Sequence, residues 1–317
     1  MAAMIAKAMS NPAKSRKSPV RSAAAADASP SLSADEPVAV AGCLYVVATP
    51  IGHRDDLSQR AISTLRAVAA IACEDTRHSG PLLNAIGAAS KRIALHDHNE
   101  TEASAGLVAQ MRRGDDIALI SDAGTPLVSD PGFRLVRAAA EAGIRVIPIP
   151  GPSAVIAALS VAGLATDRFS FEGFLPAKSS ARRAVLQALR DDARTLVFYE
   201  ARHRIVESLE DMADVFGAAR AAVVARELTK TFETLLRGSL GELHARVAGD
   251  ADQQLGELVV MVAGAAPVDA DAARLAEGER ILRLLLAEQM PASRAARLAA
   301  EISGAPKNAL YKRIDPA

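Results

Sequence analysis

From Cys43 onward, short apolar runs alternate with amphipathic stretches, and this alternation constrains the fold more than any other feature. Strand-like runs cover residues 43–48, 68–73, 92–95, 116–120 and 145–149. Helical patterns lie between them at 57–66, 78–87, 101–113 and 132–142. Such alternation predicts βαβ units and a largely parallel sheet, so the first half of the chain is expected to be α/β.

A second stretch of the same kind begins near Arg168. Its strand-like runs cover residues 168–173, 195–199, 221–225, 231–237 and 257–263. Its helical patterns cover residues 178–190, 203–215 and 239–248. We expect a second α/β domain with more antiparallel pairing. The uncharged stretch Val146–Thr166 contains three prolines near its start, so it predicts a strand, a turn and a buried helix, too short to span a membrane.

The length of 317 residues favours two domains. The predicted division is a disordered tail over 1–41, an N-terminal α/β domain over 42–153, a C-terminal α/β domain over 154–264, a linker over 265–278 and a small basic helical region over 279–317. The tail is rich in Ala, Ser and Pro and lacks the apolar surface that ordering requires. An alanine-rich tail or a misassigned start codon explains it better than a transit peptide, which its basic, serine-rich composition also allows.

Charge is balanced overall but partitioned along the chain. The 37 Lys and Arg residues equal the 37 Asp and Glu residues, which excludes a uniformly basic nucleic-acid coat. Residues 247–279 hold seven acidic side chains and one basic, whereas 280–313 hold seven basic and two acidic. The helices expected at 279–290, 292–303 and 306–313 are a candidate nucleic-acid surface, although the charge pattern alone favours a small solvated bundle.

Cysteine use indicates the cellular setting. Cys43 and Cys73 are isolated from each other and from any Cys-x-x-Cys spacing. This pattern disfavours a disulfide framework and a cysteine-based zinc site. A reducing, cytoplasmic location is predicted.

Three tight turns follow predicted strands, at residues 49–52, 121–132 and 148–154. Ligands of open α/β sheets bind beyond the carboxyl ends of the strands, so three turns there predict a ligand crevice. Asp122 and Asp130 in the second turn disfavour a phosphate and suit a cation or a ribose hydroxyl. A sulfonium cofactor carrying adenosine would satisfy both. No G-x-G-x-x-G or P-loop sequence competes with this interpretation.

Three further polar clusters follow strand-like runs, at residues 73–78, 96–100 and 226–233. His96 and His98 could share a face and bind a metal. Capping of the next helix by Asn99 with Glu102 is the simpler explanation, and no metal is predicted. The cluster at 226–233 is also compatible with a solvated hairpin.

Taken together, these motifs resemble the ribosomal RNA small subunit methyltransferase I family, the cytidine 2′-O-methyltransferases of the tetrapyrrole-methylase superfamily. The matching stretches are LYVVATPIG at 44–52, EDTR at 74–77, HDHNE at 96–100, the loop 122–132, PGPSA at 150–154, FEGFLP at 171–176, RELTK at 226–230, GELV at 256–259 and KNALY at 307–311. The resemblance covers about 43–313. One departure is Arg202, where the family pattern Tyr-Glu-x-Pro-His-Arg has proline.

The resemblance implies two α/β domains with S-adenosylmethionine bound in the cleft between them, a homodimer, and methylation of the ribose 2′-oxygen of a decoding-site cytidine in 16S rRNA. Carried over by position, it also implies the residues that line the cofactor. They are Pro50, Asp122, Gly124, Thr125, Pro126, Leu127, Val128, Ser153, Ala154, Tyr199, Glu257 and Leu258.

Methyl transfer to a poorly nucleophilic hydroxyl profits from a general base. We expect that base among Glu74, Asp75 and Asp122, with Arg77 binding the neighbouring phosphate; the alternative for Glu74 and Arg77 is a structural ion pair. Basic side chains of the second domain and of the C-terminal helices are expected to hold rRNA or the small ribosomal subunit. They are Lys178, Arg182, Arg183, Arg190, Arg194, Arg294, Arg297, Lys307 and Lys312.

Two other functions remain open. A precorrin-type tetrapyrrole C-methyltransferase would use the same fold, but the turn at 49–52 and the basic C-terminal helices argue against it. A non-catalytic rRNA-binding module is the second alternative, and the many intact polar motifs argue against that one.

Overall fold

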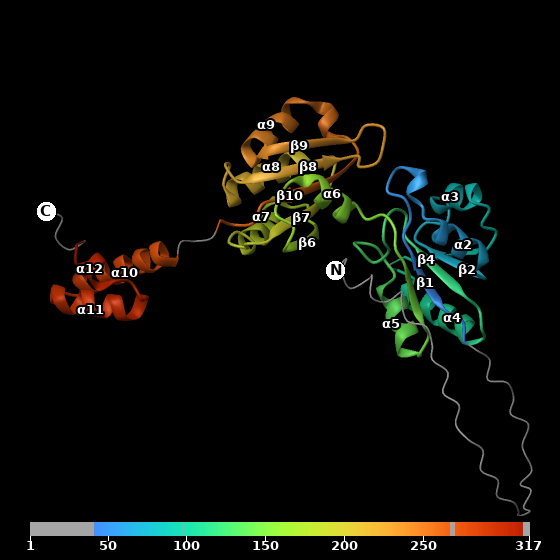
Figure 1. Ribbon diagram of the computed structural model, residues 1–317, viewed down its shortest axis with the longest axis horizontal. Coiled ribbons are helices and arrows are strands. Elements are labelled where there is room, and N and C mark those ends of the chain that lie inside the picture. Colours follow the sequence, from blue (N-terminus) through green and yellow to red (C-terminus); the bar gives the residue numbers. More distant parts are fainter. Residues whose placement is uncertain (1–40, 97, 267–269, 313–317) are drawn as a thin grey trace, which may run out of the picture. The chain divides into compact units, whose positions relative to one another are not determined.

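The computed structural model describes residues 41–96, 98–266 and 270–312, which fall within one unit of the chain and are drawn as coloured ribbon in Figure 1. Apart from Ala41, the predicted tail over 1–41 lies outside these residues. Asp97 and the end of the predicted basic region beyond 312 also lie outside them.

The first sheet is five-stranded and parallel throughout. Its strands are β1 (Leu44–Val47), β2 (Ala70–Cys73), β3 (Lys91–Ala94), β4 (Ile117–Ile120) and β5 (Val146–Ile149), in the order β3-β2-β4-β1-β5. Every neighbouring pair is parallel, which confirms the arrangement that the alternation of strands and helices predicted. The carboxyl ends of all five strands consequently lie at one edge of the sheet.

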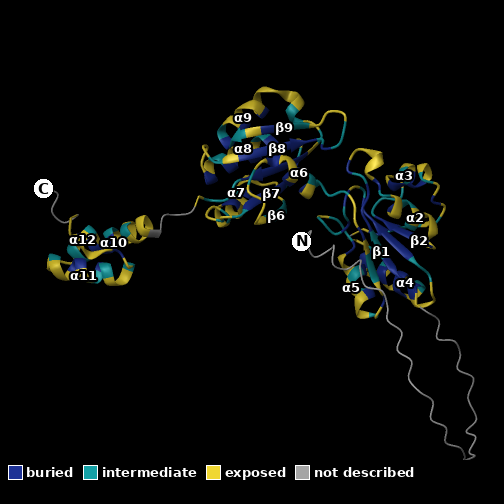
Figure 2. Ribbon diagram, in the orientation of Figure 1, coloured by how far each residue is buried: buried dark blue, intermediate teal, exposed yellow. Residues whose placement is uncertain are grey.

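Helices cover both faces of this sheet. They are α2 (Gln59–Ala67), α3 (Ser79–Ala85), α4 (Glu100–Arg112) and α5 (Phe133–Glu141). Leu65 of α2 and Leu83 of α3 pack on one face with Ile71, whereas Leu107 of α4 and Leu135 of α5 pack on the other. Figure 2 shows the consequence, with buried strands between helices whose outer sides are exposed. Coverage on both faces explains why β2 and β4 are continuous apolar runs.

The second sheet mixes parallel and antiparallel pairs. Its strands are β6 (Phe169–Phe174), β7 (Thr195–Ala201), β8 (Ala221–Arg226), β9 (Thr234–Ser239) and β10 (Glu257–Val262), in the order β6-β7-β10-β8-β9. The β6–β7 pair is parallel, and the other three pairs are antiparallel. The expected antiparallel character of this half is confirmed.

The helices of the second sheet divide unequally between its faces. They are α6 (Ala154–Ala162), α7 (Ser179–Ala188), α8 (Ile205–Phe216) and α9 (Leu240–Gly249). Leu186, Leu209 and Leu243, from α7, α8 and α9, share one core with the sheet. On the other face, α6 packs through Ala158 and Leu159. Because α6 begins directly after the third tight turn, it carries the chain from the carboxyl edge of the first sheet onto the second.

Three further helices, α10 (Ala270–Ala287), α11 (Ala292–Ser303) and α12 (Lys307–Tyr311), share a small core of their own. The prediction of a linker over 265–278 was wrong for residues 270–278, which belong to α10. Good helix formers such as Ala273, Leu275 and Glu277 explain the longer helix. Gly278 allows close packing inside it, because a Cβ there would lie only 2.8 Å from the Ser303 hydroxyl oxygen. Across the described ranges, every helix is too short or too polar to cross a bilayer.

Candidate active site

The three predicted turns meet at the carboxyl edge of the first sheet. Thr49 and Gly124 form an antiparallel bridge, in which the Thr49 N–H donates to the Gly124 carbonyl (2.8 Å) and the Gly124 N–H donates to the Thr49 carbonyl (3.0 Å). The Thr125 hydroxyl donates to the carbonyl of Pro152 (2.9 Å), which joins the second turn to the third. These bonds assemble the crevice that the spacing of the turns predicted.

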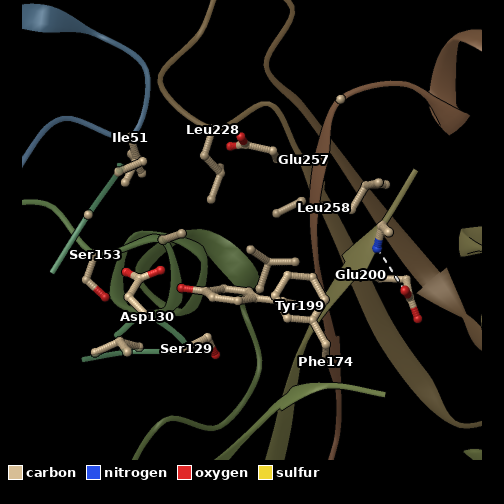
Figure 3. Close-up of a pocket in the computed structure, with 18 of the residues that line it drawn as sticks. Ile51, Ser129, Asp130, Ser153, Phe174, Tyr199, Glu200, Leu228, Glu257 and Leu258 are labelled. Atoms are coloured by element: carbon tan, nitrogen blue, oxygen red, sulfur yellow. Dashed lines mark hydrogen bonds between the residues drawn. The ribbon is translucent and has the colours of Figure 1, made fainter. Parts of the chain in front are cut away.

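A cavity of about 640 Å³ opens at this junction, within the usual range for small-molecule sites. The close-up in Figure 3 shows Ser153 and Asp130 approaching it from the first sheet, with Tyr199 and Leu258 on the opposite side. Nine of the twelve predicted cofactor residues are among its lining: Asp122, Gly124, Thr125, Val128, Ser153, Ala154, Tyr199, Glu257 and Leu258.

Three predicted cofactor residues, Pro50, Pro126 and Leu127, are absent from the lining. Pro126 is buried in the loop and Leu127 packs against the core of the first sheet, so both support the cavity wall from behind. Sequence reasoning missed other lining residues, which include Ser129, Asp130, Phe174, Glu200 and His203. Asp130 lies in the turn that the sequence singled out, but the pattern of a twelve-residue turn does not indicate which of its carboxylates faces inward.

The backbone of residues 127–132 adopts uncommon conformations. Leu127 and Ser129 have φ values of 73° and 67°, and Gly132 has 124°. Non-glycine residues rarely occupy this region, so surrounding bonds must hold the loop in place. Glu100 provides them, because its carboxylate accepts hydrogen bonds from the N–H groups of Gly132 (3.0 Å) and Arg134 (2.7 Å).

Two ionisable side chains in the cavity have strongly shifted pKa values. Burial, reinforced by the nearby charge of Asp122, raises the pKa of Asp130 to about 6, although a hydrogen bond with Ser121 opposes the shift. Burial and then the charges of Asp130 and Glu257 raise the pKa of Tyr199 to about 12. Tyr199 therefore stays protonated at neutral pH, whereas Asp130 titrates close to it.

A polar network fixes the wall formed by the start of β10. The Glu227 carboxylate accepts hydrogen bonds from the Lys230 ammonium (2.9 Å) and the Glu257 N–H (2.9 Å). Lys230 also pairs with the Glu257 carboxylate at 3.2 Å. The same loop contacts the residue that follows the first turn, because the His53 N–H donates to the Thr229 hydroxyl (3.1 Å). The cluster at 226–233 is thus tied to the cavity and is more than a solvated hairpin.

The predicted catalytic residues lie beside the cavity and in part inside it. Asp122 lines the cavity, and its carboxylate accepts a hydrogen bond from the Asp75 N–H (3.3 Å). Glu74 and Asp75 are half-buried in the turn after β2 and are not among the lining residues. Asp75 pairs with Arg77 at 3.2 Å, and the Arg77 side chain is 91% exposed.

One predicted rRNA contact is contradicted by its burial. The Arg182 side chain is 1% exposed and pairs with Asp211 at 2.6 Å, so it has no surface to offer a phosphate. Arg183 also pairs with Asp211, at 3.1 Å, but stays 43% exposed. Other predicted rRNA contacts do have exposed side chains, namely Lys178, Arg294, Arg297, Lys307 and Lys312.

The predicted cap of the helix after His96 is wrong. Asn99 precedes α4, but its side chain makes no capping hydrogen bond to that helix. Its amide oxygen instead accepts from the His96 N–H (2.9 Å), and its amide nitrogen donates to the Ala94 carbonyl (3.0 Å). Within the described ranges, no group of three or more His, Cys, Asp or Glu side chains is arranged to hold a metal ion.

Comparison with known proteins places this geometry in a fold class. The sequence pattern of the tetrapyrrole (corrin/porphyrin) methylases matches residues 43–244. Two solved structures have the same fold. The methyltransferase CobJ has a TM-score of 0.54 and 18% identity over 71% of this chain and 95% of its own. The uroporphyrin-III-C-methyltransferase of Thermus thermophilus has a TM-score of 0.51 and 20% identity over 70% of this chain and 94% of its own. The fold is therefore that of a tetrapyrrole-methylase-type protein.

Closer relatives define the family within that class. A protein of Pseudomonas aeruginosa named ribosomal RNA small subunit methyltransferase I is 57% identical to this chain, over 86% of this chain and 96% of the relative. A protein of Escherichia coli O157:H7 with the same name is 53% identical, over 86% of this chain and 94% of the relative. The pattern of the RsmI C-terminal HTH domain matches residues 272–314. The chain belongs to the ribosomal RNA small subunit methyltransferase I family.

Proposed function

We propose that this protein transfers a methyl group from S-adenosylmethionine to the ribose 2′-oxygen of a decoding-site cytidine in 16S rRNA. The observation that carries the proposal is the cavity at the carboxyl edge of the first sheet, with Asp122, Asp130 and Thr125 on its wall. Identity of 57% to a relative named for methylation of small-subunit rRNA supports the substrate. The choice of the cytidine 2′-oxygen rests on the family resemblance.

The residues of the cavity fit this methyl donor, which is consumed in each turnover and supplies a methyl group on a positively charged sulfonium. Asp122 and Asp130 give the wall a negative character that suits the cation and the donor's ribose hydroxyls. Ser153 and Ala154 stand at the start of α6, where backbone N–H groups of the first helical turn suit the donor's carboxylate. Apolar side chains, among them Leu228 and Val259, complete a site for the adenine.

Catalysis and rRNA binding belong to the same proposal. Positioning of the 2′-oxygen in line with the methyl carbon can contribute about 7–11 kcal/mol, and a general base a further factor of about 10²–10⁴. Of the bases expected from sequence, Asp122 is the one in the cavity lining. Arg77, Lys178 and Arg183, with the basic C-terminal helices, would hold rRNA phosphates. We further propose that the protein is a cytoplasmic homodimer. It acts on rRNA or on the small ribosomal subunit, and it needs neither a membrane partner nor a metal.

The decisive experiment maps ribose methylation in small-subunit rRNA from cells with and without this chain. We expect one cytidine to lose its 2′-O-methyl group in the deletion strain. Purified protein should restore the group on small subunits from that strain, whereas subunits from the parent strain, already methylated, should accept none. An unchanged map would contradict the proposal.

Calorimetry with S-adenosylmethionine addresses the two alternatives. A non-catalytic rRNA-binding module would bind rRNA without binding the donor. A tetrapyrrole C-methyltransferase would bind the donor and leave the rRNA map unchanged.

A further inference from the structure

Asp130 is the cavity carboxylate to which sequence reasoning assigned no separate role. It follows Ser129, whose φ is positive, and precedes the Pro131-Gly132 turn that Glu100 anchors. A strained loop held by a buried carboxylate fixes the direction of the side chain it carries. In Figure 3, the Asp130 carboxylate points into the cavity from the first sheet.

Tyr199 approaches the same point from the second sheet. Its ring is held edge-on by Phe171 and Phe174, with centroids 4.8 and 5.5 Å away. Figure 3 shows its hydroxyl directed toward Asp130. The Val155 N–H donates to that hydroxyl oxygen, which leaves the phenolic hydrogen free to be donated in turn. A rigid donor therefore faces a rigid acceptor.

The surroundings keep Asp130 ready to accept a proton. Its pKa of about 6 exceeds that of an ordinary aspartate, so at neutral pH it is ionised but a stronger base than a solvent-exposed carboxylate. Asp122 lines the same cavity and accepts a hydrogen bond from the Asp75 N–H, as Asp130 has one with Ser121. The other charged or titratable residues that line the cavity are Asp122, Tyr199, Glu200, Arg202, His203 and Glu257, of which Asp122 and Tyr199 interact electrostatically with Asp130.

We propose that Asp130 is the general base of methyl transfer and that Tyr199 positions its carboxylate; this rests on the proposed function. The acceptor O–H bond breaks and its proton passes to an Asp130 oxygen. The oxygen forms a bond to the methyl carbon, and the carbon–sulfur bond breaks with its electron pair left on sulfur. The sulfonium becomes a neutral thioether, and Asp130 returns the proton to water after product release. No electrons enter or leave the system.

The test compares Asp130→Asn with Asp122→Asn in single-turnover methylation of deletion-strain small subunits, at saturating S-adenosylmethionine. We expect Asp130→Asn to slow the reaction by about 10²–10⁴, a loss much larger than any fall in donor affinity measured by calorimetry. Asp130→Glu should recover part of the rate. Asp167→Asn, an exposed aspartate outside the cavity lining, is the matched control and should react like the unaltered protein.

The pH profile separates proton transfer from a structural role. The unaltered protein should react at a constant rate from about pH 7 to 9 and more slowly below about pH 6, or below a lower pH if the bound sulfonium favours the carboxylate. Asp130→Asn should lack this inflection and become faster as hydroxide concentration rises. Tyr199→Phe should move the inflection to higher pH, since it removes the hydroxyl group that is directed toward the carboxylate.

The inference would be overturned if Asp130→Asn kept its rate within about threefold, or if its defect appeared wholly in donor affinity. It would also be overturned if Asp122→Asn alone removed the inflection. If the unaltered protein methylated no small subunit, the proposed function itself would have failed, which is a separate result.

Discussion

The Glu100 carboxylate accepts a hydrogen bond from the backbone N–H of Gly132 at 3.0 Å, so the first turn of α4 holds the loop that leads into α5. Glu100 is 5% exposed and also accepts the Arg134 N–H. A carboxylate at a helix N-terminus satisfies donors that have no partner within the helix, and it complements the helix dipole. The side chain therefore links the fold of the first domain to the position of Asp130.

Glu100→Ala tests this link. Removal of two charge-assisted hydrogen bonds should lower the free energy of unfolding by about 1.5–3 kcal/mol, measured by urea denaturation. Glu100→Gln, which keeps an acceptor, should be less destabilised. The matched control is Glu141→Ala on α5, because its exposed pair with Arg137 should contribute at most about 0.5 kcal/mol. Equal destabilisation by the changes at 100 and 141 would refute the anchoring role.

A second prediction concerns Gly256, which has a φ of +81° and lies beside Glu227. A Cβ at this position would come within 2.4 Å of the Glu227 carboxyl carbon. Gly256→Ala should therefore destabilise the protein by more than about 1 kcal/mol. It should also weaken S-adenosylmethionine binding, because Gly256 and Glu257 line the cavity.

The control for Gly256 is Gly249→Ala. Gly249 ends α9, and a Cβ there would meet nothing within 4 Å. We expect a change in stability of less than about 1 kcal/mol and unaltered donor binding. Calorimetry of both variants checks the prediction, and normal donor affinity in Gly256→Ala would count against the role of the Glu227 network.

Breaking the buried Arg182–Asp211 pair should be among the most damaging single changes. Burial works to raise the pKa of Asp211, but hydrogen bonds from Arg182, Arg183 and Ser179 outweigh it and lower the pKa below its usual value. Asp211→Asn should cost up to about 3–5 kcal/mol at pH 7, since it leaves the buried guanidinium only the more distant Glu207 carboxylate, at 3.5 Å. Asp214→Asn, on the exposed Arg183 pair, should cost at most about 1 kcal/mol.

The pH dependence gives this prediction a direction. A carboxylate with a lowered pKa contributes stability that is present above about pH 4 and is lost as pH falls through its folded-state pKa. The difference between Asp211→Asn and the unaltered protein should therefore shrink below about pH 4. A difference that did not shrink as the pH fell below about 4 would contradict the ion pair as its cause.

Sequence reasoning found the elements and the edge of the site because both follow from local rules. Runs such as those around Ile71 and Leu119 alternate with helical patterns, and parallel strands place their following turns together. It missed the direction of side chains within the turns. Neither the inward position of Asp130 nor the burial of Arg182 has a periodic signal, because each depends on a distant partner, Glu100 or Asp211.

Asp130 should also reduce the stability of the protein when no ligand is bound. Its pKa is about 6 in the folded protein but about 4 in the unfolded chain, so the unfolded chain ionises first as pH rises. The resulting loss of stability begins near pH 4, grows up to about pH 6 and is complete above that pH. Asp130→Asn should thus raise the free energy of unfolding by roughly 1 kcal/mol at pH 8, after allowing for solvent around a half-buried group. The gain should vanish below about pH 4, and thermal denaturation at pH 4 and pH 8 measures it.

The C-terminal basic helices yield the last prediction. Arg294 and Arg297 are exposed on α11, within the stretch that matches the RsmI C-terminal HTH domain. Reversing both charges with Arg294→Glu and Arg297→Glu should weaken rRNA binding. It should also make the negative slope of log affinity against log salt shallower, by about 0.7–0.9 for each phosphate that is no longer bound. The control reverses Arg112 and Arg113, an exposed pair at the end of α4, and so changes net charge equally. Filter binding at several salt concentrations makes the measurement. If Arg294 and Arg297 bind phosphates directly, affinity and the steepness of its salt dependence should fall in the 294/297 variant alone. If both variants bind rRNA equally weakly, a general charge effect explains the result and the prediction is wrong.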